Sequence, residues 1–175
     1  MASVVYNAFK QAVAQANIDL DADDIRVALV MSNTTVDTEN DAKVYVGDFT
    51  TLDECDGANY VRKALANEAV NKDDANDRAE FDADDVTWTA LGVGTRTTVG
   101  VLIYKHVTID ADSPAIAFVE FASPVTHDGT DFTIQALISR MTSTATRGAT
   151  GIVERMSSCL RAAFRFRLQC ITTSK

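Results

Sequence analysis

The tetrapeptide Asp-Ala-Asp-Asp occurs twice, at residues 21–24 and 82–85, each time just before an apolar run. Carboxylates at alternate positions are typical ligands of calcium loops, so the repeat raises the question of a metal site. Read from Asp19, the first copy has Asp24 at position six, where the sharp turn of a calcium loop needs glycine. It has Val30 at position twelve, where the loop needs a bidentate glutamate. The pattern does not predict this kind of calcium site.

Turn formation explains both copies better. Aspartate side chains accept hydrogen bonds from nearby backbone amides in turns, and charges at strand ends discourage pairing between sheet edges. The second copy, read from Asp82, has Val93 at position twelve and fails the same test. We predict that these acidic clusters mark chain reversals and that the chain holds no metal ion and no other cofactor. A looser structural cation held by backbone oxygens is the alternative.

The other reactive residue types form no catalytic pattern. His106 and His127 lie far apart in the sequence, and neither a GxSxG elbow nor a local Cys/His signature is present. The three cysteines, Cys55, Cys159 and Cys170, are odd in number and form no CxxC pair, which argues against a disulfide framework and a zinc site. We therefore predict no catalytic residues and no enzymatic activity. A small hydrolase would require a pocket that joins a histidine to a serine or cysteine.

Apolar patterning predicts one short helix followed by many short strands. Apolar residues recur at helical spacing over residues 3–17, with Ser3 as the expected cap. Residues 60–70 favour a helix by type, but their flanks resemble loops between strands, and we predict a strand. The expected strands occupy residues 25–31, 44–52, 60–70, 79–81, 86–91, 96–105, 115–121 and 131–138. The predicted fold class is mainly β: an antiparallel β-sandwich or barrel-like module with a short N-terminal α-helix and a basic C-terminal arm.

Three further expectations concern individual positions. Pro114 and Pro124 bracket residues 115–121 and should lie outside that strand's ladder. The glycine-containing stretch at residues 91–100 lacks a phosphate-loop pattern and is expected to be a hairpin turn. Trp88, the only tryptophan, alternates with threonines and is expected in the core.

Charge divides the chain into an acidic body and a basic end. Residues 1–134 hold 9 Lys/Arg and 24 Asp/Glu, a net charge of 9 − 24 = −15, whereas residues 135–175 hold 7 Lys/Arg and one acid, a net charge of 7 − 1 = +6. The acidic body argues against specific nucleic-acid binding. The longest apolar runs are far too short to cross a bilayer, so no membrane contact is expected. No signal-peptide pattern opens the sequence, and we expect synthesis in a cytoplasm.

We predict two regions: a β-rich domain over residues 1–135 and a basic C-terminal segment over residues 136–175. The C-terminal segment fits a helix, a strand or an extended arm, and each of these would show one apolar and one basic face. A basic face of this kind is suited to an acidic neighbouring subunit; the alternatives are another anionic surface, such as phosphates, or a solvated face. The candidate intersubunit contacts are Arg155, Arg161, Phe164, Arg165, Phe166 and Arg167.

Three stretches carry a family resemblance: "VVYNAFKQAVAQANIDLDADDIRVALVMSNTT", "YVRKALANEAVNKDDANDRAEFDADDVTWTAL" and the later "GVLIYK…SPAIAFVEFASP…DGTDFTIQ". Together they span roughly residues 3–135, and this part of the chain resembles small virion structural proteins of tailed bacteriophages. The shared motifs are structural and bring no catalytic residues with them. The basic segment after residue 135 has no counterpart in the pattern.

The resemblance implies a capsid decoration (cement) protein on the particle surface, made in the cytoplasm of a bacterial host. Its expected partners are the major capsid protein and copies of itself, as a homotrimer. The alternatives are a neck, tail or head-fibre component, or a virion-displayed module that binds host-surface glycans.

Overall fold

The computed structural model describes residues 3–39, 43–75, 78–135, 138–143, 162–167 and 170–172, with only the backbone described for Arg78 and for all residues beyond 135. Strands make up 38% of the chain and helices 11%. All strand pairs are antiparallel within the described part, and the α-helix α1 (Asn7–Ala14) lies near the N-terminus. The predicted mainly β, antiparallel fold with a short N-terminal helix is confirmed.

The largest sheet has five strands in the order β1-β8-β7-β2-β3. Its three central strands are rich in β-branched and aromatic residues. β2 and β7 are almost entirely buried, as is most of residues 115–121 of β8, which is expected for strands covered on both faces, whereas residues 122–124 of β8 are exposed. Its strands are β1 (Val4–Val5), β2 (Ile25–Met31), β3 (Lys63–Ala64), β7 (Thr98–Lys105) and β8 (Ala115–Val125).

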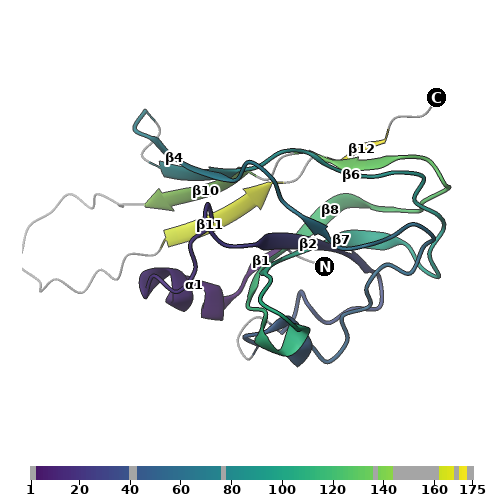
Figure 1. The fold of residues 1–175 in the computed structure, drawn as a ribbon, viewed down its shortest axis with the longest axis horizontal. Helices are drawn as coiled ribbons and strands as arrows, with labels where there is room; N and C mark the ends of the chain where they lie inside the picture. Colours follow the sequence, from purple (N-terminus) through teal and green to yellow (C-terminus); the bar gives the residue numbers. More distant parts are fainter. Residues whose placement is uncertain are drawn as a thin grey trace, which may run out of the picture.

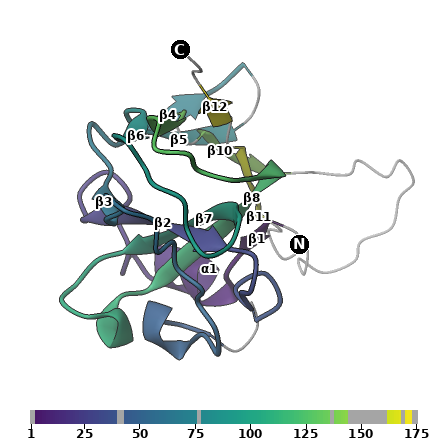
Figure 2. The same cartoon turned by 90° about the vertical axis from the view of Figure 1, so that its right-hand side faces the viewer.

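Two smaller sheets lie together on one side of the five-stranded sheet in both views (Figures 1 and 2). One has the order β11-β10-β5-β4, and the other has the order β12-β9-β6. Their strands are β4 (Ala69–Asp73), β5 (Arg78–Asp82), β6 (Val86–Trp88), β9 (Phe132–Ile134), β10 (Ile138–Ser143), β11 (Ala162–Arg167) and β12 (Cys170–Thr172). The finer expectation of a sandwich or a barrel stays a prediction.

The main core joins the five-stranded sheet to the two smaller sheets. Trp88 of β6 is fully buried there, as the alternating sequence predicts, and stacks near Tyr60 with ring centroids 6.4 Å apart. Its indole Nε1 donates a 2.7 Å hydrogen bond to the Val61 carbonyl, so the polar end of the ring is satisfied. Phe81 and Phe132 contribute to this core from the two smaller sheets.

A second apolar cluster covers the opposite face of the five-stranded sheet. Val36 and Phe49, from the long connection between β2 and β3, pack there with Tyr6. The Tyr6 ring lies 5.3 Å from the Phe49 ring, and its hydroxyl donates to the Val36 carbonyl at 2.9 Å. These contacts fix a connection that has little regular secondary structure.

Helix α1 starts later than the sequence predicts. Val4 and Val5 pair with β8 instead of entering the helix, and Ser3 accepts a hydrogen bond from the Glu120 amide instead of capping it. The helix begins after Tyr6 and buries Phe9 against the main core. The first residues of the predicted helix thus form a short strand that pairs with the edge of β8.

Two predicted elements are wrong. Residues 44–52 form no strand but a 3₁₀ turn, η1 (Val46–Asp48), because the Asp48 carboxylate accepts hydrogen bonds from two preceding amides. Residues 91–100 form no hairpin, since they lead from β6 in one sheet to β7 in another. A second 3₁₀ turn, η2 (Asp110–Asp112), precedes β8.

Pro124 lies inside β8, contrary to the expectation that both prolines flank the strand. The β7–β8 pairing passes from Gly100↔Glu120 directly to Thr98↔Val125, so Pro124 falls where the register shifts. A proline is tolerated in such a bulge because its missing N–H removes no ladder hydrogen bond.

The predicted division between residues 135 and 136 stays a prediction. Three strands beyond that point pair with strands before it or with each other: β10 with β5 and β11, and β12 with β9. Residues 162–167 are therefore a strand, one of the three forms considered for the basic segment.

Candidate interaction surface

The first Asp-Ala-Asp-Asp copy shapes the entry to β2. Asp23 accepts a 2.8 Å hydrogen bond from the Asp19 amide and forms a 2.8 Å ion pair with Lys105 at the end of β7. Asp24 pairs with Arg26 at 2.7 Å, and this contact lowers the pKa of Asp24. Asp23 thus has the turn-forming role that the sequence predicts, whereas the Asp24 carboxylate forms an ion pair with Arg26.

The second copy makes one local contact and one to a residue distant in sequence. Asp82 accepts a hydrogen bond from the Ala83 amide, and Asp84 accepts one of 2.6 Å from the side-chain amide of Asn67. Within the described ranges, no three His, Cys, Asp or Glu side chains gather in a group that could hold a metal ion.

The two histidines are in different environments. His127 is buried, contacts the Phe132 ring edge-on, and shares a 2.9 Å hydrogen bond between its Nε2 and the Thr98 hydroxyl. Burial lowers the pKa of His127, which favours the neutral ring. His106 lies at the end of β7, edge-on to Tyr104, and its backbone amide donates to the Asp24 carbonyl. The contacts of the His127 ring are those of a packing residue, whereas the Nδ1 atom of His106 is buried without a hydrogen-bond partner among the described residues.

A surface built from two loops is the strongest candidate for function. The loop before η1 and the loop around η2 are joined by an isolated bridge between Tyr45 and Pro114. Backbone bonds flank that bridge, from the Ala115 amide to the Val44 carbonyl and from the Val46 amide to the Ser113 carbonyl, each 2.9 Å long. The two 3₁₀ turns are therefore held side by side.

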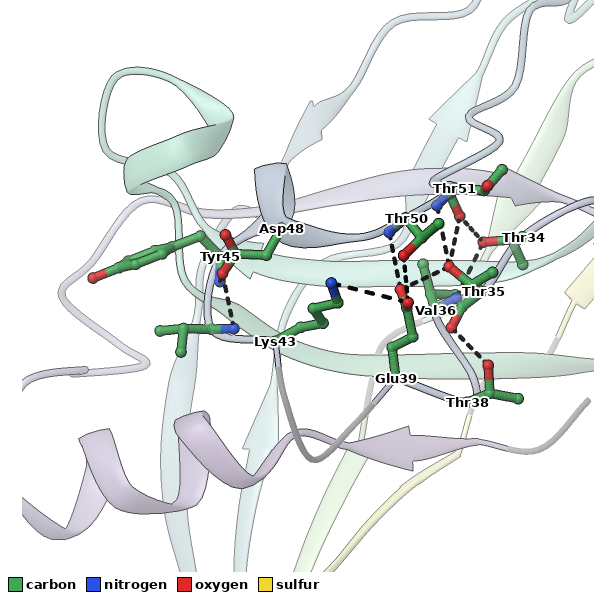
Figure 3. Close-up of polar contacts among 11 residues, drawn as sticks. Thr34, Thr35, Val36, Thr38, Glu39, Lys43, Tyr45, Asp48, Thr50 and Thr51 are labelled. Atoms are coloured by element: carbon green, nitrogen blue, oxygen red, sulfur yellow. Dashed lines mark hydrogen bonds and ion pairs between the residues drawn. The ribbon is translucent and has the colours of Figure 1, made fainter.

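Exposed apolar side chains gather on these two loops. Val44 and Tyr45 are 40% and 38% exposed, and Val107 and Ile109 are 51% and 57% exposed. We call these four residues the η1–η2 corner. A cluster of exposed large apolar residues on an ordered surface is typical of an interaction site. Figure 3 shows the Tyr45 ring pointing away from η1.

Glu39 anchors the loop that carries half of the corner (Figure 3). Its carboxylate accepts hydrogen bonds of 2.6 and 2.9 Å from the hydroxyl and amide of Thr50, and one of 2.7 Å from the Thr35 hydroxyl. Lys43 adds an ion pair at 3.9 Å. These bonds, those from Thr50 above all, lower the pKa of Glu39 to about 2. The anchor is therefore intact above the ordinary glutamate pKa and is lost only as the pH falls towards 2.

Arg62 anchors the loop around η2, which carries the other two residues of the η1–η2 corner. Its guanidinium bonds both carboxylate oxygens of Asp110 in η2 and both oxygens of Glu54, and it lies 5.3 Å from the centre of the Tyr104 ring. Tyr60 donates a further 2.7 Å hydrogen bond to Glu54. The bidentate contacts raise the pKa of Arg62 and lower that of Asp110. The guanidinium thereby ties η2 to the edge of the large sheet.

The structure describes only part of the predicted intersubunit contacts. Arg155 and Arg161 lie outside the described residues. Residues 164–167 lie in β11, where their backbone pairs with β10 at the edge of a four-stranded sheet. Sequence reasoning missed the η1–η2 corner. Its only local signal was the pair of short apolar patterns in turn-rich stretches, "VYV" at residues 44–46 and "VTI" at residues 107–109.

Comparisons with protein-family models, curated proteins and solved structures found no match to this chain. Within the described residues, no helix is long and apolar enough to span a membrane.

Proposed function

We propose that the protein is a structural component of a tailed-phage virion: a decoration protein that binds the major capsid protein and self-associates as a homotrimer on the particle surface. The observation that carries the proposal is the η1–η2 corner, an exposed apolar surface on two braced loops. The sequence resemblance over residues 3–135 is the reason for proposing a tailed-phage virion as the particle.

The η1–η2 corner is suited to binding another protein by burial of apolar surface, which requires no chemical reaction. Removing apolar surface from water contributes about 25 cal/mol per Å², and a surface whose loops are already ordered loses little conformational entropy on binding. The anchors at Glu39 and Arg62 provide that order. Each contact is modest, but on a symmetric capsid several subunits bind together and their contacts reinforce one another. The bound protein would bridge neighbouring capsid subunits.

A binding assay with purified capsids tests this attachment. Ile109→Asp places a charge on an exposed apolar residue of the corner, and we expect it to weaken co-sedimentation with capsids at least about tenfold, or about 1.4 kcal/mol. Val93→Asp is the matched control, because Val93 is 64% exposed but lies on the loop before β7, away from the corner. Equal binding by both variants and the unmodified protein would refute the role of the corner.

A host-glycan-binding module is the second candidate. Tyr45 favours it, since an exposed aromatic ring could stack on a sugar. Trp88 disfavours it, because the only tryptophan is fully buried. A glycan-array screen separates the two functions: binding that is lost in Tyr45→Ala would support the glycan module, and an array without hits would leave the capsid role.

A further inference from the structure

We propose that the η1–η2 corner binds a partner surface that is both apolar and basic: a patch of the capsid protein in which lysine or arginine side chains flank apolar ones. The inference rests on the proposed attachment to capsids and names the chemistry of the surface that the corner contacts. Four exposed apolar side chains define the corner, and one exposed aspartate in each 3₁₀ turn supplies the charge that selects a basic partner.

Each 3₁₀ turn joins an exposed apolar residue to an aspartate three residues later. In η1 the Asp48 amide donates a 3.1 Å hydrogen bond to the Tyr45 carbonyl, and in η2 the Asp112 amide donates one of 3.1 Å to the Ile109 carbonyl. Figure 3 shows Asp48 beside Tyr45. The same turn closure therefore keeps an aspartate next to an exposed apolar residue in both loops.

The two turns are in direct contact, which brings these aspartates near each other. A Cβ on Gly47 would lie 3.0 Å from the Ala111 amide nitrogen and 3.1 Å from the Ala111 Cα. Asp48 and Asp112 are the next residues along the chain, and consecutive Cα atoms are about 3.8 Å apart, so the two aspartate Cα atoms are separated by no more than about 12 Å. The Debye length in 0.1 M salt is about 10 Å, so both charges act on the same partner surface.

Within the described part of the chain, neither Asp48 nor Asp112 has an ion-pair partner. The cations that brace the two loops are paired with other carboxylates. Lys43 pairs with Glu39, and the guanidinium of Arg62 bonds two carboxylates of its own. The corner therefore presents negative charge next to apolar surface, and a partner with positive charge around an apolar patch is complementary to both features.

The same charge argues against the acidic body of a second copy as the occupant of the corner. Residues 1–134 have a net charge of −15, so this body would repel the two aspartates. Like charges that face each other across an interface weaken binding and slow association. Self-association of the protein would then use a different surface.

Retention on immobilised peptides tests this chemistry without a purified particle. The full-length protein is applied to short peptides that combine leucine with lysine, leucine with glutamate, leucine with serine, or lysine with serine. Asp112→Lys reverses one charge of the corner, and Asp112→Asn removes it, should the reversal disturb the turn. Asp74→Lys is the matched control: it gives the same net charge, but Asp74 lies in the turn between β4 and β5, across the molecule from the corner (Figure 1), with a side chain 75% exposed.

We expect the leucine–lysine peptides to retain the unmodified protein most strongly. In about 0.1 M salt, Asp112→Lys should reduce this retention at least about threefold relative to Asp74→Lys, and Asp112→Asn should reduce it by a smaller factor. The difference should disappear in about 1 M salt, where the Debye length is about 3 Å.

Four results would overturn the inference. Stronger retention by the glutamate or serine peptides with leucine would exclude a basic partner, and equal retention by the lysine–serine peptides would exclude the apolar part. An equal loss in Asp112→Lys and Asp74→Lys would show that only the net charge matters. A smaller oligomer of Asp112→Lys in size-exclusion chromatography would make the corner an interface between copies. Each of these results leaves the attachment to capsids to the co-sedimentation assay.

Discussion

Individual polar residues in this protein act mainly by holding loops and core contacts in place. The side chains of His127 and Thr98 are hydrogen-bonded to each other inside the core. Glu39 and Arg62 each make hydrogen bonds to more than one residue. The Asp19–Asp23 and Asp82–Ala83 hydrogen bonds of the Asp-Ala-Asp-Asp repeats could be predicted as turn contacts, because they are local in sequence. The partners of Arg62 could not, because Asp110 is 48 residues away and meets it only in the folded chain.

His127 should make stability depend on pH. Its pKa is lowered from 6.5 by burial, so below about pH 6.5 the unfolded chain binds a proton before the folded chain does. Stability is therefore fully present above pH 6.5 and falls as the pH drops below it, with a slope of at most about 1.4 kcal/mol per pH unit. In His127→Gln this slope should shrink, as measured by urea unfolding between pH 7 and pH 5. Equal slopes for the two proteins would show that His127 is not the responsible group.

Arg62→Lys should destabilise the protein by about 1.5–3 kcal/mol, because a lysine cannot bond two carboxylates in bidentate fashion. Arg96→Lys is the control. Arg96 makes an ion pair with Asp53 but is 45% exposed, so its substitution should cost no more than about 1 kcal/mol. Chemical denaturation measures both values. If Arg62→Lys lowered the free energy of unfolding no more than Arg96→Lys does, the contacts of Arg62 would contribute little to stability.

At the scale of elements, the buried strands were the most predictable part. β2, β7 and β8 are long apolar runs, and their burial follows from composition alone. Short segments near strand edges were less predictable. The start of α1 was decided by pairing with the distant strand β8. The η1 turn combines local hydrogen bonds to Asp48 with backbone hydrogen bonds to the distant residues Ser113 and Ala115.

Gly100 is required by the close approach of β7 and β8. A Cβ at this position would lie 2.5 Å from the Val119 carbonyl and 2.6 Å from the Phe118 ring, so Gly100→Ala should cost about 3 kcal/mol, the upper end of the usual overpacking range. Gly129→Ala is the comparison: Gly129 has φ +90° but open space around it, and only backbone strain of about 1–2 kcal/mol is expected. Thermal unfolding should rank Gly100→Ala as the less stable variant, and the reverse order would contradict the packing of these two strands.

For the whole molecule, the division of charge and the placement of the C-terminal strands bear on assembly. A chain that ends at Ser143 keeps β10 and nearly all the acidic residues but lacks β11 and β12. We expect it to fold with reduced stability and to sediment as a monomer where the full chain forms an oligomer. Analytical ultracentrifugation measures this. An unchanged oligomer would show that residues 144–175 are dispensable for self-association.

The most direct test of the proposed function is the position of the protein in an intact particle. Under this proposal, electron cryomicroscopy of the particles should show its density at threefold or quasi-threefold sites on the outer capsid surface, with the η1–η2 corner against the major capsid protein. Density on a sixfold or twelvefold axis would assign the protein to the tail or neck. Its absence from purified particles would contradict the virion role altogether.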